Sequence, residues 1–320
     1  MLLAAAHPLT FFRAIVIGLI QGVTELFPIS SLGHSVLLPT LFGWDDLVKS
    51  QTQSESFYLA FVVGLHVASA LALLWFYRKD WVAIIRAFCR TLVTRKVETS
   101  EERLAWLIVI ATVPTGLIGL AFEHKLRVLF SKPMAAAIFL TINGLILLGG
   151  ERVRKRSEVR ALTARDGSDG YEGEGREGRE GREERAGRGG RRLDTLQYKE
   201  GALIGVSQSL ALLAGISRSG VTMVAGLIRG LDHEDAVKFA FLLATPIILA
   251  AGVYKLPDLT GHLGDGIRGQ VLAGSVVAGL ASYVSVRFLT RYFKSRNLTP
   301  FGIYCLIAGV FFVVYSLIYV

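Results

Sequence analysis

The sequence predicts an all-α integral membrane protein built from one arrangement of helices that occurs twice with inverted topology. The 320 residues are 52% hydrophobic and only 19% charged, most of the charge lies in a few segments, and two polar motifs recur at a fixed spacing. Ordinary soluble domains carry about 25% charged residues. The composition therefore favours several membrane spans over a water-soluble globular domain.

Six apolar runs are each close to the roughly 17 to 25 residues that a membrane-spanning helix needs. These predicted spans are 57–77, 105–122, 133–150, 236–254, 270–286 and 300–320. Two further apolar stretches, 11–41 and 201–231, are interrupted near the middle by Pro, Gly and polar residues. Because non-helical backbone at membrane depth is tolerated only inside protein or along a cavity, we expect both stretches to be re-entrant, broken helical hairpins at a site.

The formal net charge of +9 is unevenly distributed between loops. Segments 78–103, 151–200 and 287–296 hold 7, 14 and 4 Lys and Arg, whereas 43–56, 123–132 and 255–268 hold 1, 3 and 2. The positive-inside rule places the first set in the cytoplasm and both chain ends outside. In segment 151–200 the basic residues are offset by 12 acidic ones, so nucleic acid is not an expected partner.

The chain repeats itself at a constant offset. Gln21, Ser30 and Gly33 correspond to Gln208, Ser217 and Gly220, each pair 187 positions apart. Each copy is one broken hairpin followed by three spans, and since three is odd, the second copy must be inverted relative to the first. The predicted organisation is a first repeat at 1–150, a cytoplasmic insert at 151–200 and a second repeat at 201–320. The insert contains a Glu, Gly and Arg tract at 167–190 and is expected to be disordered.

The first motif places a carboxylate, two hydroxyls and an imidazole in an apolar stretch. Gln21 and Glu25 share a helix face, Pro28 disfavours helical continuation, and Ser30 and Ser31 supply hydroxyls that can start a new helix before His34. Ionisable groups in lipid cost roughly 2.5–3.5 kcal/mol on insertion scales, so they usually serve a function. The alternative is a buried Glu25 that only braces the hairpin, but the neighbouring hydroxyl and imidazole favour a functional site.

The second motif has the composition of a phosphate clamp. Gly215, Ser217, Arg218, Ser219 and Thr222 combine a flexible glycine, three hydroxyls and a guanidinium at a helix start. Backbone N–H groups and the helix dipole bind an anion there, and arginine adds a bidentate contact. The alternative is a capped helix whose arginine reaches the membrane surface. The pairing of the two motifs favours one composite site near the bilayer midplane.

These residues carry a family resemblance. Gln21-Gly22-x-Thr24-Glu25-x-x-Pro28-x-Ser30-Ser31-x-Gly33-His34 and Gly215-x-Ser217-Arg218-Ser219-x-x-Thr222 resemble the two signature motifs of the BacA/UppP family, the undecaprenyl-diphosphate phosphatases. The resemblance covers nearly the whole chain apart from the insert. It departs from the family pattern at Gln21, where the family's first motif begins with an acidic residue, and at Ala214, where a proline usually stands.

The resemblance implies a multi-pass protein of the bacterial plasma membrane whose active site opens to the extracytoplasmic side. The implied reaction hydrolyses a polyprenyl diphosphate to its monophosphate and inorganic phosphate, which recycles the lipid carrier of cell-wall synthesis and accounts for bacitracin resistance. The substrate and the bilayer are the expected partners, and a homodimer is an arrangement that the sequence allows.

The expected roles follow from charge. Glu25, Ser31, His34 and Arg218 are the candidate catalytic residues. Ser30, Ser217, Arg218, Ser219 and Thr222 are expected to bind the phosphoryl oxygens. A diphosphate carries more charge than one arginine and two helix ends can balance, so we expect a divalent cation held by Glu25 with support from the Gln21 amide. Mg²⁺ is the expected ion, with Ca²⁺ as the alternative.

The sequence leaves the attacking group open between Ser31 activated by His34, His34 itself, and water activated by Glu25 or His34, with Ser31 or His34 preferred. The alternative function is a polyprenyl-phosphate flippase or an anion transporter, because inverted repeats with broken helices are a transporter architecture. A transporter needs the clamp but not a nucleophile with a base. A purely scaffolding protein would leave Glu25 and Arg218 unexplained.

Other polar residues are expected to be structural. His66, inside the first predicted span, is interpreted as hydrogen-bonded packing, and Asp232 with Asp235 as a helix cap. Cys89 and Cys305 lie on different elements, so no disulfide is expected.

Overall fold

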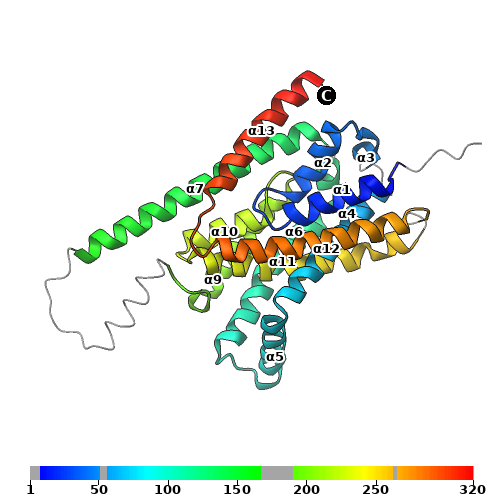
Figure 1. Cartoon of the computed structure of the whole chain (residues 1–320). Coiled ribbons are helices and arrows are strands. Elements are labelled where there is room, and N and C mark those ends of the chain that lie inside the picture. The colour runs from blue at the N-terminus through cyan, green and yellow to red at the C-terminus, as the bar shows by residue number, and fades with distance from the viewer. Residues whose placement is uncertain (1–7, 51–55, 131, 167–189, 262–264, 320) are drawn as a thin grey trace, which may run out of the picture.

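The computed structural model describes residues 8–50, 56–130, 132–166, 190–261 and 265–319, and these ranges are built from helices with no β-strand (Figure 1). Within these ranges, six helices are long and apolar enough to cross a membrane. They are α4 (Phe57–Phe76), α6 (Ser100–Phe130), α7 (Pro133–Asp166), α11 (His233–Thr260), α12 (Arg268–Tyr292) and α13 (Thr299–Tyr319). The prediction of an all-α membrane protein with six spans is confirmed.

The observed helices extend beyond the predicted spans where charged residues continue the helix. α6 begins at Ser100 rather than at 105, and α7 continues to Asp166 rather than ending at 150. Hydropathy marks only the apolar part of a helix, whereas Glu, Arg and Lys are good helix formers in water. Figure 1 shows the charged end of α7 extending away from the bundle.

Each interrupted stretch folds as a helix, a break and a second helix. In the first, α1 (Phe11–Thr24) is followed by α2 (Ser31–Leu41). In the second, α9 (Tyr198–Gln208) and a 3₁₀ turn, η2 (Ser209–Leu212), are followed by α10 (Arg218–Ile228). The second helices begin with equivalent caps, since Ser30 Oγ accepts from the Gly33 N–H and Ser217 Oγ from the Gly220 N–H, both at 3.2 Å. The shared motif therefore encodes the same helix start twice.

The described part of the insert differs from the disorder expected over 151–200. Residues 151–166 belong to α7, and 190–200 contain η1 (Leu193–Thr195) and the start of α9. Arg191 anchors this segment: its N–H donates to the Gly230 carbonyl at 2.6 Å, and its guanidinium contacts Glu200 at 3.0 Å. Residues 167–189, most of the Glu, Gly and Arg tract, lie outside the described residues.

The helices interlock between the two halves of the chain. α1 packs against α12 and α9 against α6, while α7 packs against α13 and α4 against both α11 and α12. Two remaining helices are short or peripheral: α3 (Asp45–Ser50), and α5 (Arg78–Thr94), which pairs with the start of α6. Trp106 Nε1 on α6 donates to Thr91 Oγ1 on α5 at 3.0 Å. This interlocking brings the two broken hairpins together in the interior.

Candidate active site

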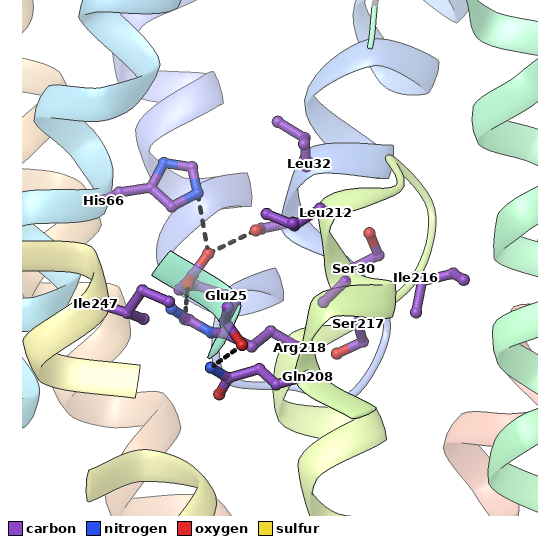
Figure 2. Close-up of a pocket in the computed structure, with 13 residues that line it drawn as sticks. Glu25, Ser30, Leu32, His66, Gln208, Leu212, Ile216, Ser217, Arg218 and Ile247 are labelled. Carbon is purple, nitrogen blue, oxygen red and sulfur yellow. Dashed lines mark hydrogen bonds and ion pairs between the residues drawn. The ribbon is translucent and has the colours of Figure 1, made fainter. Parts of the chain in front are cut away.

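The two breaks meet at a buried carboxylate and a buried guanidinium. Glu25 follows the last residue of α1, and Arg218 is the first residue of α10. Their side chains form an ion pair, Arg218 Nη2 to Glu25 Oε1, with 4% of the Glu25 side chain and 18% of the Arg218 side chain exposed (Figure 2). The inference that the two motifs form one composite site agrees with this contact.

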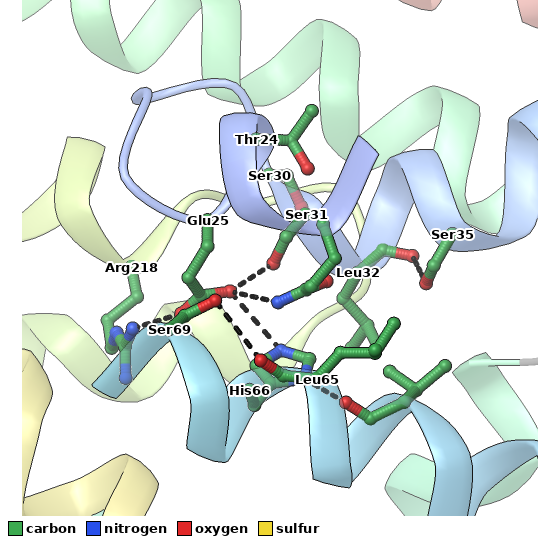
Figure 3. Close-up of polar contacts among 12 residues, drawn as sticks. Thr24, Glu25, Ser30, Ser31, Leu32, Ser35, Leu65, His66, Ser69 and Arg218 are labelled. Carbon is green, nitrogen blue, oxygen red and sulfur yellow. Dashed lines mark hydrogen bonds and ion pairs between the residues drawn. The ribbon is translucent and has the colours of Figure 1, made fainter. Parts of the chain in front are cut away.

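Glu25 is surrounded by hydrogen-bond donors. Oε2 accepts from Ser31 Oγ at 2.5 Å and from Gln21 Nε2 at 2.9 Å, and His66 Nε2 lies 3.2 Å away (Figure 3). Burying a carboxylate is costly unless it is paired and hydrogen-bonded, and these partners meet that requirement. With Arg218, these partners link the Glu25 carboxylate to four helices: α1, α2, α4 and α10.

Sequence reasoning missed His66. Its Nδ1 lies 2.8 Å from the Val62 carbonyl oxygen and its Nε2 faces the Glu25 carboxylate, so both ring nitrogens face acceptors, an arrangement satisfied by an imidazolium. Arg218 and His66 both line the same cavity, so both can face an anionic ligand there. The signal was an ionisable residue inside a predicted span, the same signal that identified Glu25.

The start of α10 presents the groups of an anion site. Ser217 and Ser219 hydroxyls lie 3.0 Å apart, and Arg218 Nη1 donates to the Ala244 carbonyl at 3.4 Å. Among the described residues, Arg218 Nε is buried without a hydrogen-bond partner. Thr222 lies further along α10 and contacts Gln208 Oε1 at 3.4 Å. Ser217 and Arg218 line the cavity next to this helix start, whereas Ser219 donates to the Phe27 carbonyl and does not line it. Thr222 joins the two helices of its own hairpin and does not line the cavity either.

A cavity of about 140 Å³ lies against the ion pair. Six of its lining residues form three pairs, each pair being one residue of the first repeat and the residue 187 positions later: Glu25 and Leu212, Ser30 and Ser217, and Ser31 and Arg218. Its remaining lining residues are Leu32, His66, Thr115, Gln208, Ala211, Ile216 and Ile247. Figure 2 shows the labelled polar side chains close to apolar ones from α2, η2 and α11. The cavity can therefore hold a charged group beside an apolar one.

His34 does not contact the Glu25 cluster. Its Nδ1 lies 2.7 Å from the Ser30 carbonyl oxygen, and its Nε2 lies 2.8 Å from the Tyr304 hydroxyl on α13. Its ring stacks on Tyr304 with centroids 5.8 Å apart, and it does not line the cavity. The expected pairing of Ser31 with His34 is therefore absent, because Ser31 donates to Glu25 instead.

Ser30 joins the two loops through its side-chain hydroxyl. Its hydroxyl accepts from the Gly215 N–H at 3.2 Å as well as from Gly33, and its φ is 70°. Gly215 has φ +110° and a Cβ on Gly33 would come within 3.0 Å of its Cα, so the loops cross where both residues are glycine. A non-glycine residue at positive φ marks strain of the kind found at functional sites. Ser30 lines the cavity as expected for a phosphate ligand, but its hydroxyl already accepts two N–H groups.

A divalent cation would find one carboxylate and one amide oxygen here. No group of three or more His, Cys, Asp or Glu suited to a metal occurs in the part of the chain that the structure describes. Gln21 Nε2 binds Glu25, which leaves Gln21 Oε1 buried with no partner among those residues. Mg²⁺ commonly uses one or two protein oxygens with substrate phosphates and water, so Glu25, which lines the cavity, fits this type of site, whereas Gln21 does not line the cavity.

The chain matches the family described as Bacitracin resistance protein BacA over residues 14–311, which includes both motifs. The chain belongs to the BacA family. It is 57% identical to Undecaprenyl-diphosphatase 2 of Frankia alni, with 95% of this chain and 97% of that protein covered. It is also 53% identical to Undecaprenyl-diphosphatase of Mycolicibacterium paratuberculosis, with 95% and 96% covered, and to that of Mycobacterium avium, with 94% and 95% covered. The resemblance to BacA found in the sequence is thus confirmed.

Proposed function

We propose that this BacA-family protein is a membrane-embedded phosphatase that hydrolyses undecaprenyl diphosphate to the monophosphate and inorganic phosphate. The observation that carries the proposal is the Ser31–Glu25–Arg218 arrangement beside a cavity with polar and apolar walls. Undecaprenyl diphosphate likewise joins a charged diphosphate group to an apolar prenyl chain. The names of the relatives, undecaprenyl-diphosphatases at 53–57% identity, support the same reaction.

In the proposed mechanism the substrate phosphate takes over Arg218 from Glu25. The terminal phosphoryl group would then lie at the start of α10, where the guanidinium, the Ser217 hydroxyl and the helix N–H groups balance its charge. A phosphoryl group competes well for arginine because it carries more charge and matches its bidentate geometry. Loss of its arginine partner leaves Glu25 free to accept a proton.

The hydrogen bond from Ser31 to Glu25 supports Ser31 as the attacking group. Ser31 Oγ would bond to the terminal phosphorus while its proton passes to Glu25, and the bond from that phosphorus to the bridging oxygen would break to release the lipid monophosphate. Water would then hydrolyse the phosphoserine to inorganic phosphate and return the serine. Direct attack by His34 is disfavoured because its ring contacts Ser30 and Tyr304.

A divalent cation, Mg²⁺ with Ca²⁺ as the alternative, is part of the proposal. Glu25 would hold it through one carboxylate oxygen while the other accepts from Ser31, the Gln21 amide oxygen would support it, and the ion would supply charge stabilisation at the phosphoryl oxygens. Removing the metal with a chelator is expected to lower phosphate release, and added Mg²⁺ is expected to restore it.

We also propose that the two halves, 1–150 and 201–320, are inverted repeats with re-entrant hairpins. The reciprocal packing of α1 on α12 and α9 on α6 supports this arrangement, as do the equivalent caps at Ser30 and Ser217. The loop charges support a site that opens to the extracytoplasmic side of the bacterial plasma membrane. A homodimer remains a prediction.

The experiment is phosphate release from undecaprenyl diphosphate by purified protein in detergent. Glu25→Gln and Arg218→Ala are each expected to lower kcat by about 10²-fold or more, the loss typical of removing a phosphate-binding or transition-state group. Thr91→Val is the matched control because it removes a buried interhelical hydrogen bond away from the cavity. Activity that withstands both site substitutions would exclude this chemistry and favour the transporter alternative, which substrate movement across proteoliposomes would reveal.

A further inference from the structure

Asn143 on α7 lies between the two polar loops and is completely buried. Its Nδ2 donates to the Pro28 carbonyl at 3.0 Å, and its Oδ1 accepts from the Ser217 N–H at 3.0 Å. The second Nδ2 hydrogen points to Cys305 Sγ at 3.3 Å on α13. Both amide hydrogens therefore have partners, as a buried amide requires.

The two main partners belong to opposite halves of the site. Pro28 lies in the turn between Glu25 and Ser31, and Ser217 caps the helix that begins with Arg218. One planar amide thus spans the attacking side and the phosphate-binding side. Besides the Glu25–Arg218 ion pair, the described loops share two longer hydrogen bonds, 3.2 Å from the Gly215 N–H to Ser30 Oγ and 3.4 Å from Ser219 Oγ to the Phe27 carbonyl.

The chemistry of this position requires a donor and an acceptor at fixed angles. A carbonyl oxygen faces one end of the side chain and an N–H faces the other. Aspartate would keep the acceptor for Ser217 but would set a carboxylate oxygen against the Pro28 carbonyl. Leucine has similar size and neither function, so it would leave both backbone groups without a partner.

We propose that Asn143 is a positioning residue for the phosphatase reaction. It sets the separation and alignment of Ser31 and Arg218 by holding their loops on one rigid helix, and it does not itself contact the phosphate. The proposal rests on the proposed function. In-line phosphoryl transfer depends on such alignment, and a misplacement of about 1 Å can cost about 10²-fold in rate.

The test compares Asn143→Leu and Asn143→Asp with wild type and with Thr91→Val. Thr91 is also a buried polar residue in an interhelical hydrogen bond, but on the α5–α6 hairpin. Phosphate release from undecaprenyl diphosphate gives kcat and KM per folded molecule, after size-exclusion selection. Amide hydrogen exchange over residues 213–219 reports on the Ser217 N–H independently of activity.

Asn143→Leu is expected to lower kcat by about 30- to 100-fold with KM within about threefold, because the loops remain present but misaligned. Exchange over 213–219 is expected to accelerate. Asn143→Asp should lower kcat while keeping more of the Ser217 protection than leucine does. Thr91→Val should leave both readouts at wild-type values.

A kcat within threefold of wild type for folded Asn143→Leu, or unchanged exchange over 213–219, would overturn the proposal. If the leucine variant does not fold, the same criteria apply to Asn143→Asp with kcat as the deciding value. A wild-type protein that releases no phosphate would instead contradict the proposed function, and the exchange comparison would still test the bridge.

Discussion

Glu25 and Arg218, which are 193 residues apart in the chain, share a buried ion pair at the point where the two broken hairpins meet. Neither hairpin contains both charges. Each buried charge is costly alone and is stabilised only when the halves of the protein pack together. The pair therefore couples correct assembly of the two halves to formation of the site.

Arg218→Lys tests whether the guanidinium shape matters beyond its charge. Arg218 contacts Glu25 and the Ala244 carbonyl through different nitrogens, a fork that a single ammonium cannot reproduce. We expect kcat/KM to fall at least about tenfold, measured as phosphate release at saturating and limiting substrate. Full activity of the lysine variant would indicate that charge alone is sufficient.

His66→Leu tests the residue that the structure adds to the site. Loss of the ring removes one partner of the buried Glu25 carboxylate and one polar group from the cavity wall, so we expect about a tenfold fall in kcat. Tyr304→Phe, which removes only a partner of His34, is the control and should change kcat less than about threefold. A larger fall in kcat for Tyr304→Phe than for His66→Leu would contradict this prediction and would indicate that His34 takes part in the reaction.

Leu212→Glu tests the asymmetry between the repeats. Leu212 occupies the position equivalent to Glu25 on the wall of the same cavity, so a carboxylate there would repel an anionic substrate. We expect KM to rise at least about tenfold. Leu212→Gln has nearly the same size without the charge and should retain more of the affinity. Equal losses in both variants would point to size rather than charge.

Glu200→Gln tests the anchor of the segment before α9. Hydrogen bonds from Arg191 hold the pKa of Glu200 below its usual value, assisted by the Gln197 N–H. Because the folded pKa is lowered, this stabilisation is complete above the ordinary glutamate pKa of 4.5 and is lost as the pH falls through the folded value. The variant should melt about 1–3 °C below wild type at pH 7, a small change because the pair lies near the surface, with 40% of the Arg191 side chain exposed.

The expected difference in melting temperature between wild type and Glu200→Gln should shrink as the pH is lowered from 6 toward 3. Differential scanning fluorimetry in detergent measures it at each pH. A difference that stays constant over this range would show that the Glu200 charge does not contribute.

Local sequence determined the helices and their breaks. Apolar runs of sufficient length specified the six spans, Pro28 ended the first short helix, and the hydroxyls of Ser30 and Ser217 capped the next ones, because capping and hydropathy act within a few residues. Glu25, Ser31 and Arg218 were also identifiable, since polar groups in an apolar stretch indicate a site wherever they lie.

Only the tertiary structure decided which of these groups meet. Helix α4 is apolar on all sides, so its sequence does not indicate which of its faces packs against the site. Its packing against α11 and α12 places His66 next to Glu25. His34, although close to Ser31 in sequence, is drawn to the Ser30 carbonyl and to Tyr304 on α13. The repeated motifs predicted that the two loops share one site, but the direct ion pair of Glu25 with Arg218 and the bridge through Asn143 depend on contacts between distant segments, which arise from packing and not from local sequence.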